Sequence, residues 1–302
     1  MGGLIIAAGF GVALAVLSLP SSGVSATIGD SVGQSGIELI PGTARLILVL
    51  FVLFSLIGFV DDYVVPRLLV GKRGLGWKQK IAMQLVAALV YAVPAYSGNA
   101  TYIGVAVFLV LFFSNAYNFS DGLDGLAGSL LVTLSFGLMG VAAIAGHSEV
   151  LPVLMALVGA TIPFLVLNAP PAKIFMGDVG SLGIGAVFGA TVLMITLPVT
   201  THQVAHFSGP PPGPPIGICL ALVVASLMMV VELVPVPLQI ASVKLRHKKL
   251  FPYTPIHHAF EKAGWPESRV VWLFALCQFV LSALAIQIAV GLSVENGVTL
   301  VR

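Results

Sequence analysis

Five aspartates stand in short polar segments that interrupt long apolar runs of the sequence. Two adjoin at the end of one run (GFVDDY), two follow in NAYNFSDGLDGLAG, and one lies in FMGDVGS: Asp61, Asp62, Asp121, Asp124 and Asp178. Carboxylates with an amide oxygen suit a hard cation such as Mg²⁺. Lys and His side chains in the neighbouring polar segments suit phosphate charge. One such Asp is often only a solvated loop end, but five grouped in this way predict metal-assisted phosphoryl chemistry.

The composition indicates that this chemistry takes place at a membrane. The chain has 302 residues, of which 58% are apolar and 9% charged, with a net charge of +2 and a mean hydropathy of +1.06. Soluble domains carry about 25% charged residues. A soluble enzyme, a nucleic-acid-binding protein and a disordered chain are therefore excluded. The sequence predicts an all-α, polytopic transmembrane bundle, because a helix satisfies its own backbone in lipid.

Nine apolar stretches approach the roughly 20 residues that a membrane-spanning helix needs. The first has no basic segment before it, so it is predicted to be a retained helix rather than a signal peptide. No soluble domain fits between the stretches, and residues 1–302 are predicted to form one membrane domain. The expected spans are 2–19, 44–60, 81–97, 103–117, 128–146, 149–167, 181–199, 216–240 and 270–291.

The basic residues are divided unequally between the two sides. Four loops on one side hold 12 of the 14 Lys and Arg residues, and cytoplasmic loops are the ones enriched in these residues. The same four loops carry the aspartates and the two histidines of PIHHAFEKAGWPE. The predicted active site is therefore cytoplasmic, lies against the lipid bilayer, and consists of loops 61–80, 118–127, 168–180 and 241–269.

Ion transport is the natural rival function. Transport pathways use ionisable side chains in the middle of the membrane, and Glu232 is the exception among spans that otherwise lack them. The Asp61-Asp62 pair instead follows the apolar run 46–60 directly, at the boundary between hydrocarbon and water. This position favours phosphoryl transfer to a substrate that is partly lipid.

Four motifs resemble those of one enzyme family. GFVDDY, NAYNFSDGLDGLAG, FMGDVGS and PIHHAFEKAGWPE occur in the order found in the polyprenyl-phosphate N-acetylhexosamine-1-phosphate transferases. The histidine segment, and the Glu232, Gln239 and Lys244 run before it, resemble the phospho-N-acetylmuramoyl-pentapeptide transferase branch. The resemblance implies transfer from UDP-N-acetylmuramoyl-pentapeptide to undecaprenyl phosphate, with lipid I and UMP as products of a step in peptidoglycan synthesis.

The resemblance also implies Mg²⁺ as the cofactor, the bacterial cytoplasmic membrane as the location and a possible homodimer. Asn118 and Asp178 are expected to hold Mg²⁺, and Asp61 to accept the proton of the lipid phosphate, although a covalent aspartyl route is the alternative. Asp62 is expected to assist. The histidine pair expected near the uridine and diphosphate is His257 and His258.

The remaining positions carried over from the family concern substrate binding. A uracil pocket is expected from Gly122, Leu123, Asp124 and Phe175, with Asp121 orienting the loop. Further substrate contacts are expected from Asn115, Gln239, Lys78 and Lys80.

The sequence departs from the family pattern at three places. Val65 stands where the family has Lys, with Arg67 or Lys72 as possible substitutes, and Ala259 replaces a third histidine. The chain begins at MGG, where the family has a preceding helix and a Lys-containing stretch ending in PTMGG, which would make ten spans. Two alternatives remain open: an N-acetylglucosamine-1-phosphate transferase, and an inactive homologue.

Overall fold

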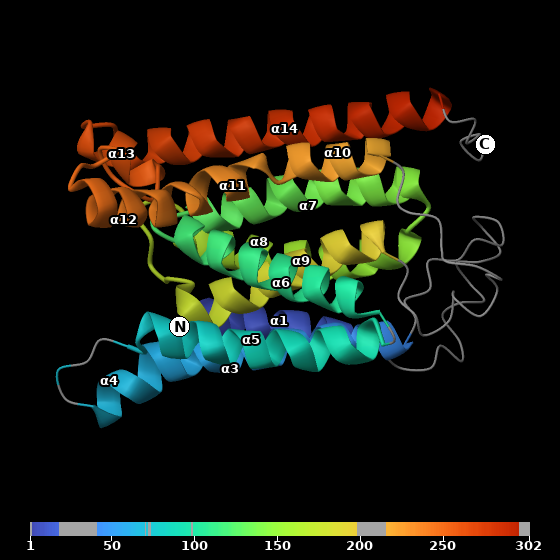
Figure 1. Cartoon of the computed structure of the whole chain (residues 1–302), viewed down its shortest axis with the longest axis horizontal. Coiled ribbons are helices and arrows are strands. Elements are labelled where there is room, and N and C mark those ends of the chain that lie inside the picture. The colour runs from blue at the N-terminus through green and yellow to red at the C-terminus, as the bar shows by residue number, and fades with distance from the viewer. Residues whose placement is uncertain are drawn as a thin grey trace.

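The computed structural model describes residues 2–17, 41–69, 71, 74–97, 99–197 and 216–295. Within these ranges the chain is helical and contains no strand, which confirms the all-α prediction (Figure 1). The elements are α1 (Gly2–Leu17), α3 (Pro41–Phe59), η1 (Val60–Val64), α4 (Val65–Leu68), α5 (Trp77–Ala95), α6 (Ala100–Ser120), α7 (Leu126–Ala145), η2 (Ser148–Val150), α8 (Leu151–Asn168), α9 (Gly177–Thr196), α10 (Ile216–Ala225), α11 (Leu227–Leu233), α12 (Pro235–Arg246), α13 (His257–Lys262) and α14 (Glu267–Glu295).

Within the described residues, each of the nine expected spans overlaps helix. In the described part of the chain, seven helical segments are long and apolar enough to cross a membrane, and Gly2–Val16 and Ile216–Ala225 are shorter apolar helices. The protein is therefore a multi-pass membrane protein. The expected single span 216–240 is instead divided: α10 ends before Ser226, and α12 starts at Pro235, whose ring supplies no N–H to the preceding turn.

Helix α9 occupies the centre of the bundle (Figure 1), and 94% of its most apolar 18-residue stretch is buried. Its glycines allow the α6 backbone to approach closely. A methyl group on Gly185 would lie 2.5 Å from the Phe113 carbonyl oxygen, and one on Gly189 would lie 2.7 Å from that of Leu109. Small residues of this kind are the usual means of packing helices in lipid, so α6 and α9 form a close pair.

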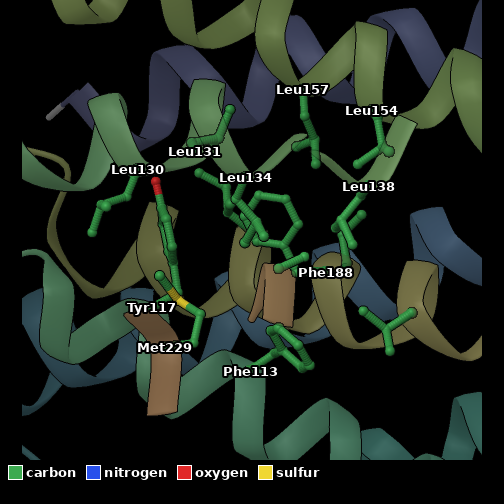
Figure 2. Packing of buried hydrophobic residues seen from close by; sticks show 14 of the residues in the cluster. Phe113, Tyr117, Leu130, Leu131, Leu134, Leu138, Leu154, Leu157, Phe188 and Met229 are labelled. Carbon is green, nitrogen blue, oxygen red and sulfur yellow. The ribbon is translucent and has the colours of Figure 1, made fainter. Parts of the chain in front are cut away.

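Large side chains pack between α6, α7 and α9. Phe113 and Tyr117 of α6, Leu134 of α7 and Phe188 of α9 are buried together (Figure 2). The Tyr117 and Phe188 rings meet edge to face with their centroids 5.7 Å apart, and the Tyr117 hydroxyl donates to the Ala127 carbonyl at 2.8 Å. This hydrogen bond joins the end of α6 to the start of α7 and fixes the loop between them.

The turn that carries the adjacent aspartates is wider than an α-helical turn. Helix α3 continues into the π-helical turn η1, which contains Asp61 and Asp62, before α4 resumes. Such single π turns often occur at functional sites. Just before it, Gly58 touches the backbone of α9, since a methyl group there would lie 2.2 Å from the Asp178 carbonyl oxygen. The two acidic segments are thereby held against each other.

The chemistry-bearing segments all lie at one end of the bundle. They follow α3, α6 and α8, precede α5, α7, α9 and α14, and include α12 and α13. In Figure 1 this is the end at which α4, α12 and α13 project. The four predicted active-site loops thus share one face of the protein.

Candidate active site

Lys80 connects two carboxylates that come from distant parts of the sequence. Its Nζ donates to Asp61 Oδ2 at 3.0 Å and also contacts Asp178 Oδ2. The backbone N–H of Leu75 donates to the other oxygen of Asp61. The structure therefore brings together Asp61 and Asp178, as the sequence predicted, and adds a cation between them that the sequence assigned only to substrate binding.

Asn118 completes this group from the end of α6. Its Nδ2 atom donates to Asp178 Oδ1 at 2.7 Å and to Ser181 Oγ at 2.8 Å. The Ser181 hydroxyl in turn donates to the Gly177 carbonyl at 3.0 Å. The side chains of Asn118 and Asp178 are thus fixed relative to the first turn of α9.

This donor set fits Mg²⁺. The carboxylates of Asp61 and Asp178 already share a positive group, and both residues and Asn118 offer oxygen atoms. Among the residues that the structure describes, no three His, Cys, Asp or Glu side chains form a complete metal site. Mg²⁺ usually takes only one or two carboxylates and keeps its waters or substrate phosphates, so a sparse set of protein ligands suits it.

Asp62 makes different contacts from Asp61 and is more exposed. Its Oδ2 atom accepts the backbone N–H of Asp178 at 2.8 Å, at the start of α9. It also lines a cavity of ≈ 100 Å³ together with Gly3, Tyr63, Phe175 and Gly177. Phe175 is 63% exposed there, so its ring is available to a ligand.

Asp121 ends the α6 helix next to this group. Its Oδ2 atom accepts the Gly177 N–H at 3.0 Å, which supports the predicted loop-orienting role. Burial, opposed by that hydrogen bond and helped by the negative charges of Asp178 and Asp62, raises the pKa of Asp121 to about 8. The carboxyl group thus holds its proton near neutral pH in the absence of a bound cation.

Asp124 is held by the protein at both its backbone and its side chain. Its Oδ2 atom accepts the Ala172 N–H at 2.8 Å, and its own N–H donates to Glu267 Oε1 at 2.6 Å. Asn168 accepts the Gly125 N–H at 3.0 Å and donates to the Ile174 carbonyl at 2.8 Å. The 118–127 and 168–180 loops are therefore tied into one unit that places Leu123 and Gly122 beside Asp124.

The two histidines have different surroundings. His257 is fully buried, and its Nδ1 atom lies 2.8 Å from Glu232 Oε2, which is also fully buried. His258 is about one-third exposed and pairs with Glu261 at 2.8 Å; this hydrogen bond lowers the pKa of Glu261. The structure thus places His257 beneath the site and His258 at its surface.

Three predicted substrate contacts are engaged elsewhere. Asn115 exchanges side-chain hydrogen bonds with Gln84 of α5, the shorter at 2.8 Å. The Gln239 amide binds the backbone of Leu250 and Phe251 at 2.8 to 3.1 Å. Lys78 is exposed and lies over the Trp77 ring at 5.6 Å. None of these contacts joins its side chain to the aspartate group, so their substrate roles stay predictions.

The departures from the family pattern can also be placed. Val65 is only 8% exposed and brings no charge to the site. Arg67, two residues further along, lies with its guanidinium 6.0 Å from the ring centroid of Tyr63, which lines the cavity. Lys72 is outside the described residues. Of the two expected substitutes, Arg67 is the one that lies within the described residues, and its role toward a phosphate stays a prediction.

Sequence reasoning missed the partners of the site residues. Glu267, Gln84 and Ser181 each bind a predicted site residue, yet nothing local marks them as functional. Glu232 did carry a signal, because it is an acidic residue within an apolar span. Its partner could not be inferred, since His257 is 25 residues away and on another helix.

Comparison with known proteins identifies the family of the chain. Residues 44–196 match the profile described as glycosyl transferase family 4. The phospho-N-acetylmuramoyl-pentapeptide-transferase of Enterococcus hirae is 34% identical over 266 residues, covering 81% of this chain and 74% of the relative. That of Clostridioides difficile is 32% identical over 254 residues, covering 77% and 71%. That of Bacillus cytotoxicus is 35% identical over 269 residues, covering 82% and 75%. The chain therefore belongs to glycosyl transferase family 4, among the phospho-N-acetylmuramoyl-pentapeptide-transferases.

Proposed function

We propose that this protein transfers phospho-N-acetylmuramoyl-pentapeptide from its UDP-linked donor to undecaprenyl phosphate, which yields lipid I and UMP. The names of its relatives supply the donor class. The observation that carries the proposal is the Lys80 ammonium group shared by Asp61 and Asp178. The two reacting phosphates are both anions, so their mutual repulsion must be offset. Asp61 and Asp178 hold a positive group at the membrane boundary, where it can do this.

The acceptor side of the reaction is assigned to Asp61. An oxygen of the lipid phosphate attacks the β-phosphorus of the nucleotide, the bond from that phosphorus to the bridging oxygen breaks, and UMP leaves with the electron pair. Asp61 takes the proton of the attacking phosphate. Its position at the end of the apolar run 46–60 keeps the isoprenoid tail in the membrane, and the cavity beside Asp62 offers the phosphate a place to enter.

The donor side is assigned to Asn118 and Asp178, which would hold Mg²⁺. When bound, the metal supplies positive charge to the diphosphate. Lys80 adds a fixed cation from α5, and its contacts with both carboxylates would be exchanged for phosphate contacts as the substrates enter. This assignment makes the reaction dependent on Mg²⁺.

The uridine is assigned to the joined loops beside this group. Asp124 offers an acceptor to the base N–H, the exposed ring of Phe175 offers a stacking face, and Gly122 and Leu123 complete the wall. The basic residues on the same side would attract the anionic donor. We place this face in the cytoplasm and the protein in the bacterial cytoplasmic membrane, following the distribution of Lys and Arg.

The test is a direct assay of the purified protein with two donors. UDP-N-acetylmuramoyl-pentapeptide and UDP-N-acetylglucosamine are each supplied with undecaprenyl phosphate and Mg²⁺, and the lipid product and UMP are measured. We expect product from the first donor, and loss of product when EDTA removes the metal. Product only from the second donor would assign the chain to the sister activity, and product from neither would contradict the proposal.

A further inference from the structure

A buried acid and base lie directly beneath the predicted uridine loop. Glu232 on α11 and His257 at the start of α13 have side chains with 0% exposure, and Glu232 Oε2 lies 2.8 Å from His257 Nδ1. A buried carboxylate is costly unless a hydrogen bond or a charge compensates it. The pair is thus a built feature of the protein and not a surface contact.

The free edge of the imidazole points at the loop. A methyl group built on Gly122 would lie 2.3 Å from His257 Nε2, so the ring edge abuts the glycine backbone. Among the described residues, neither His257 Nε2 nor Glu232 Oε1 has a hydrogen-bond partner. The only ring nitrogen that is not engaged with Glu232 therefore faces the segment between Asp121 and Asp124.

We propose that Glu232 is a positioning residue that holds a proton on His257 Nδ1 and thereby keeps Nε2 directed at the Gly122 segment. A carboxylate can only accept a hydrogen bond, so it requires the proton to be on Nδ1. The hydrogen bond made by one ring nitrogen fixes both the state of the other nitrogen and the ring orientation. This inference rests on the proposed function insofar as His257 acts on the substrate.

Two substitutions separate the shape of Glu232 from its chemistry. Glu232→Gln keeps the size, but its amide can donate as well as accept, so it permits both forms of the ring. Glu232→Asp keeps the acceptor-only carboxylate on a shorter side chain. We expect the Gln variant to lose at least about 10-fold in kcat with KM for the nucleotide little changed, and the Asp variant to keep more activity.

The proton is observed directly by ¹⁵N NMR of histidine-labelled full-length protein in bilayers, with His257→Gln identifying the signal. We expect His257 Nδ1 to be protonated in the wild type and in Glu232→Asp, and to be partly unprotonated in Glu232→Gln. A wild-type Nδ1 without a proton, or an unchanged state in the Gln variant, would overturn the proposal. This measurement needs no turnover, so it stands even if the assay with both donors fails.

Kinetics in a second background excludes a merely structural role. In the His257→Gln background, Glu232→Gln should cause no further loss of kcat, since its effect passes through His257. An equal loss in both backgrounds would overturn the proposal. The matched control is Glu149→Gln, which changes the Glu149–His147 pair with its 3.0 Å contact. This pair precedes the start of α8, whereas the candidate site lies at the other end of that helix. That variant should keep wild-type activity.

Discussion

The side-chain amide of Asn118 donates a hydrogen bond to Asp178 Oδ1 at 2.7 Å, although the two residues are 60 positions apart. The bond joins the end of α6 to the first turn of α9, two helices that pack closely through Gly185 and Gly189. The proposed metal ligands are therefore placed by the centre of the bundle and not by a loop. A site on rigid elements keeps its geometry better than one on loops.

Removing the Asp178 carboxylate should abolish turnover. Asp178→Ala deletes the acceptor for Asn118 and Lys80 and leaves the diphosphate charge without its proposed metal ligand. We expect kcat to fall by at least about 1000-fold, while the protein still extracts normally in detergent. Lipid product and UMP are measured over a range of Mg²⁺ concentrations. Near-normal, Mg²⁺-dependent activity in this variant would refute the assignment.

Asp61→Asn should lose transfer to polyprenyl phosphate and keep its affinity for the uridine nucleotide. An amide still accepts the Leu75 N–H, so the turn η1 keeps its shape, but it no longer takes a proton. We expect a loss of about 100-fold or more in lipid product, with UMP affinity within a few-fold of wild type. If Asp61 merely caps the helix, the change will be mild. Loss of both properties together would also count against an acceptor role.

Asp121 should make the stability of the metal-free protein depend on pH. Its pKa is about 8 in the folded protein against about 3.9 when unfolded, so ionisation between these values costs folding energy. Stability should fall as the pH rises from 5 to 8, by roughly 1 kcal/mol per pH unit, and then level off. Asp121→Asn, which still accepts the Gly177 N–H, should lack this decline. Melting curves of both proteins in EDTA give the difference, and parallel curves would contradict the assigned pKa.

Arg67 should serve the acceptor phosphate in place of the missing Lys. Its guanidinium lies near Tyr63, which lines the cavity next to Asp62. Arg67→Ala should raise KM for polyprenyl phosphate by about 10-fold and leave the nucleotide KM unchanged. The control is Lys262→Ala, an exposed cation on α13. Equal changes in the two KM values would show that Arg67 acts only through the general charge of this face.

The part of the site that could be predicted from sequence is the part fixed by topology. Helices that cross a membrane place alternate loops on one side. Once the spans are known, Asp61, Asp121 and Asp178 must therefore lie on the same face. The helical spans themselves follow from apolar length. The π turn at Asp61-Asp62 and the division of the 216–240 span were not predictable, because both depend on local packing.

Pairings between side chains were equally out of reach. Lys80 is 98 residues from Asp178, and Glu232 is 25 from His257. Such contacts depend on the rotation of each helix about its own axis, which an apolar composition on every side does not specify. Gln239 illustrates the same point, since its amide clamps the 250–251 backbone, and no sequence pattern distinguishes that role from ligand binding.

The contact between Gly58 and the Asp178 backbone has a mechanical consequence. No side chain separates α3 from α9 at this point. Main-chain atoms in van der Waals contact therefore set the distance between Asp61, on the side of the lipid acceptor, and Asp178, on the side of the nucleotide donor. A compressible side chain there would let lateral pressure or bilayer thickness change that separation. Backbone packed directly against backbone yields little, so we expect the distance between the Asp61 and Asp178 carboxylates to change little with bilayer thickness.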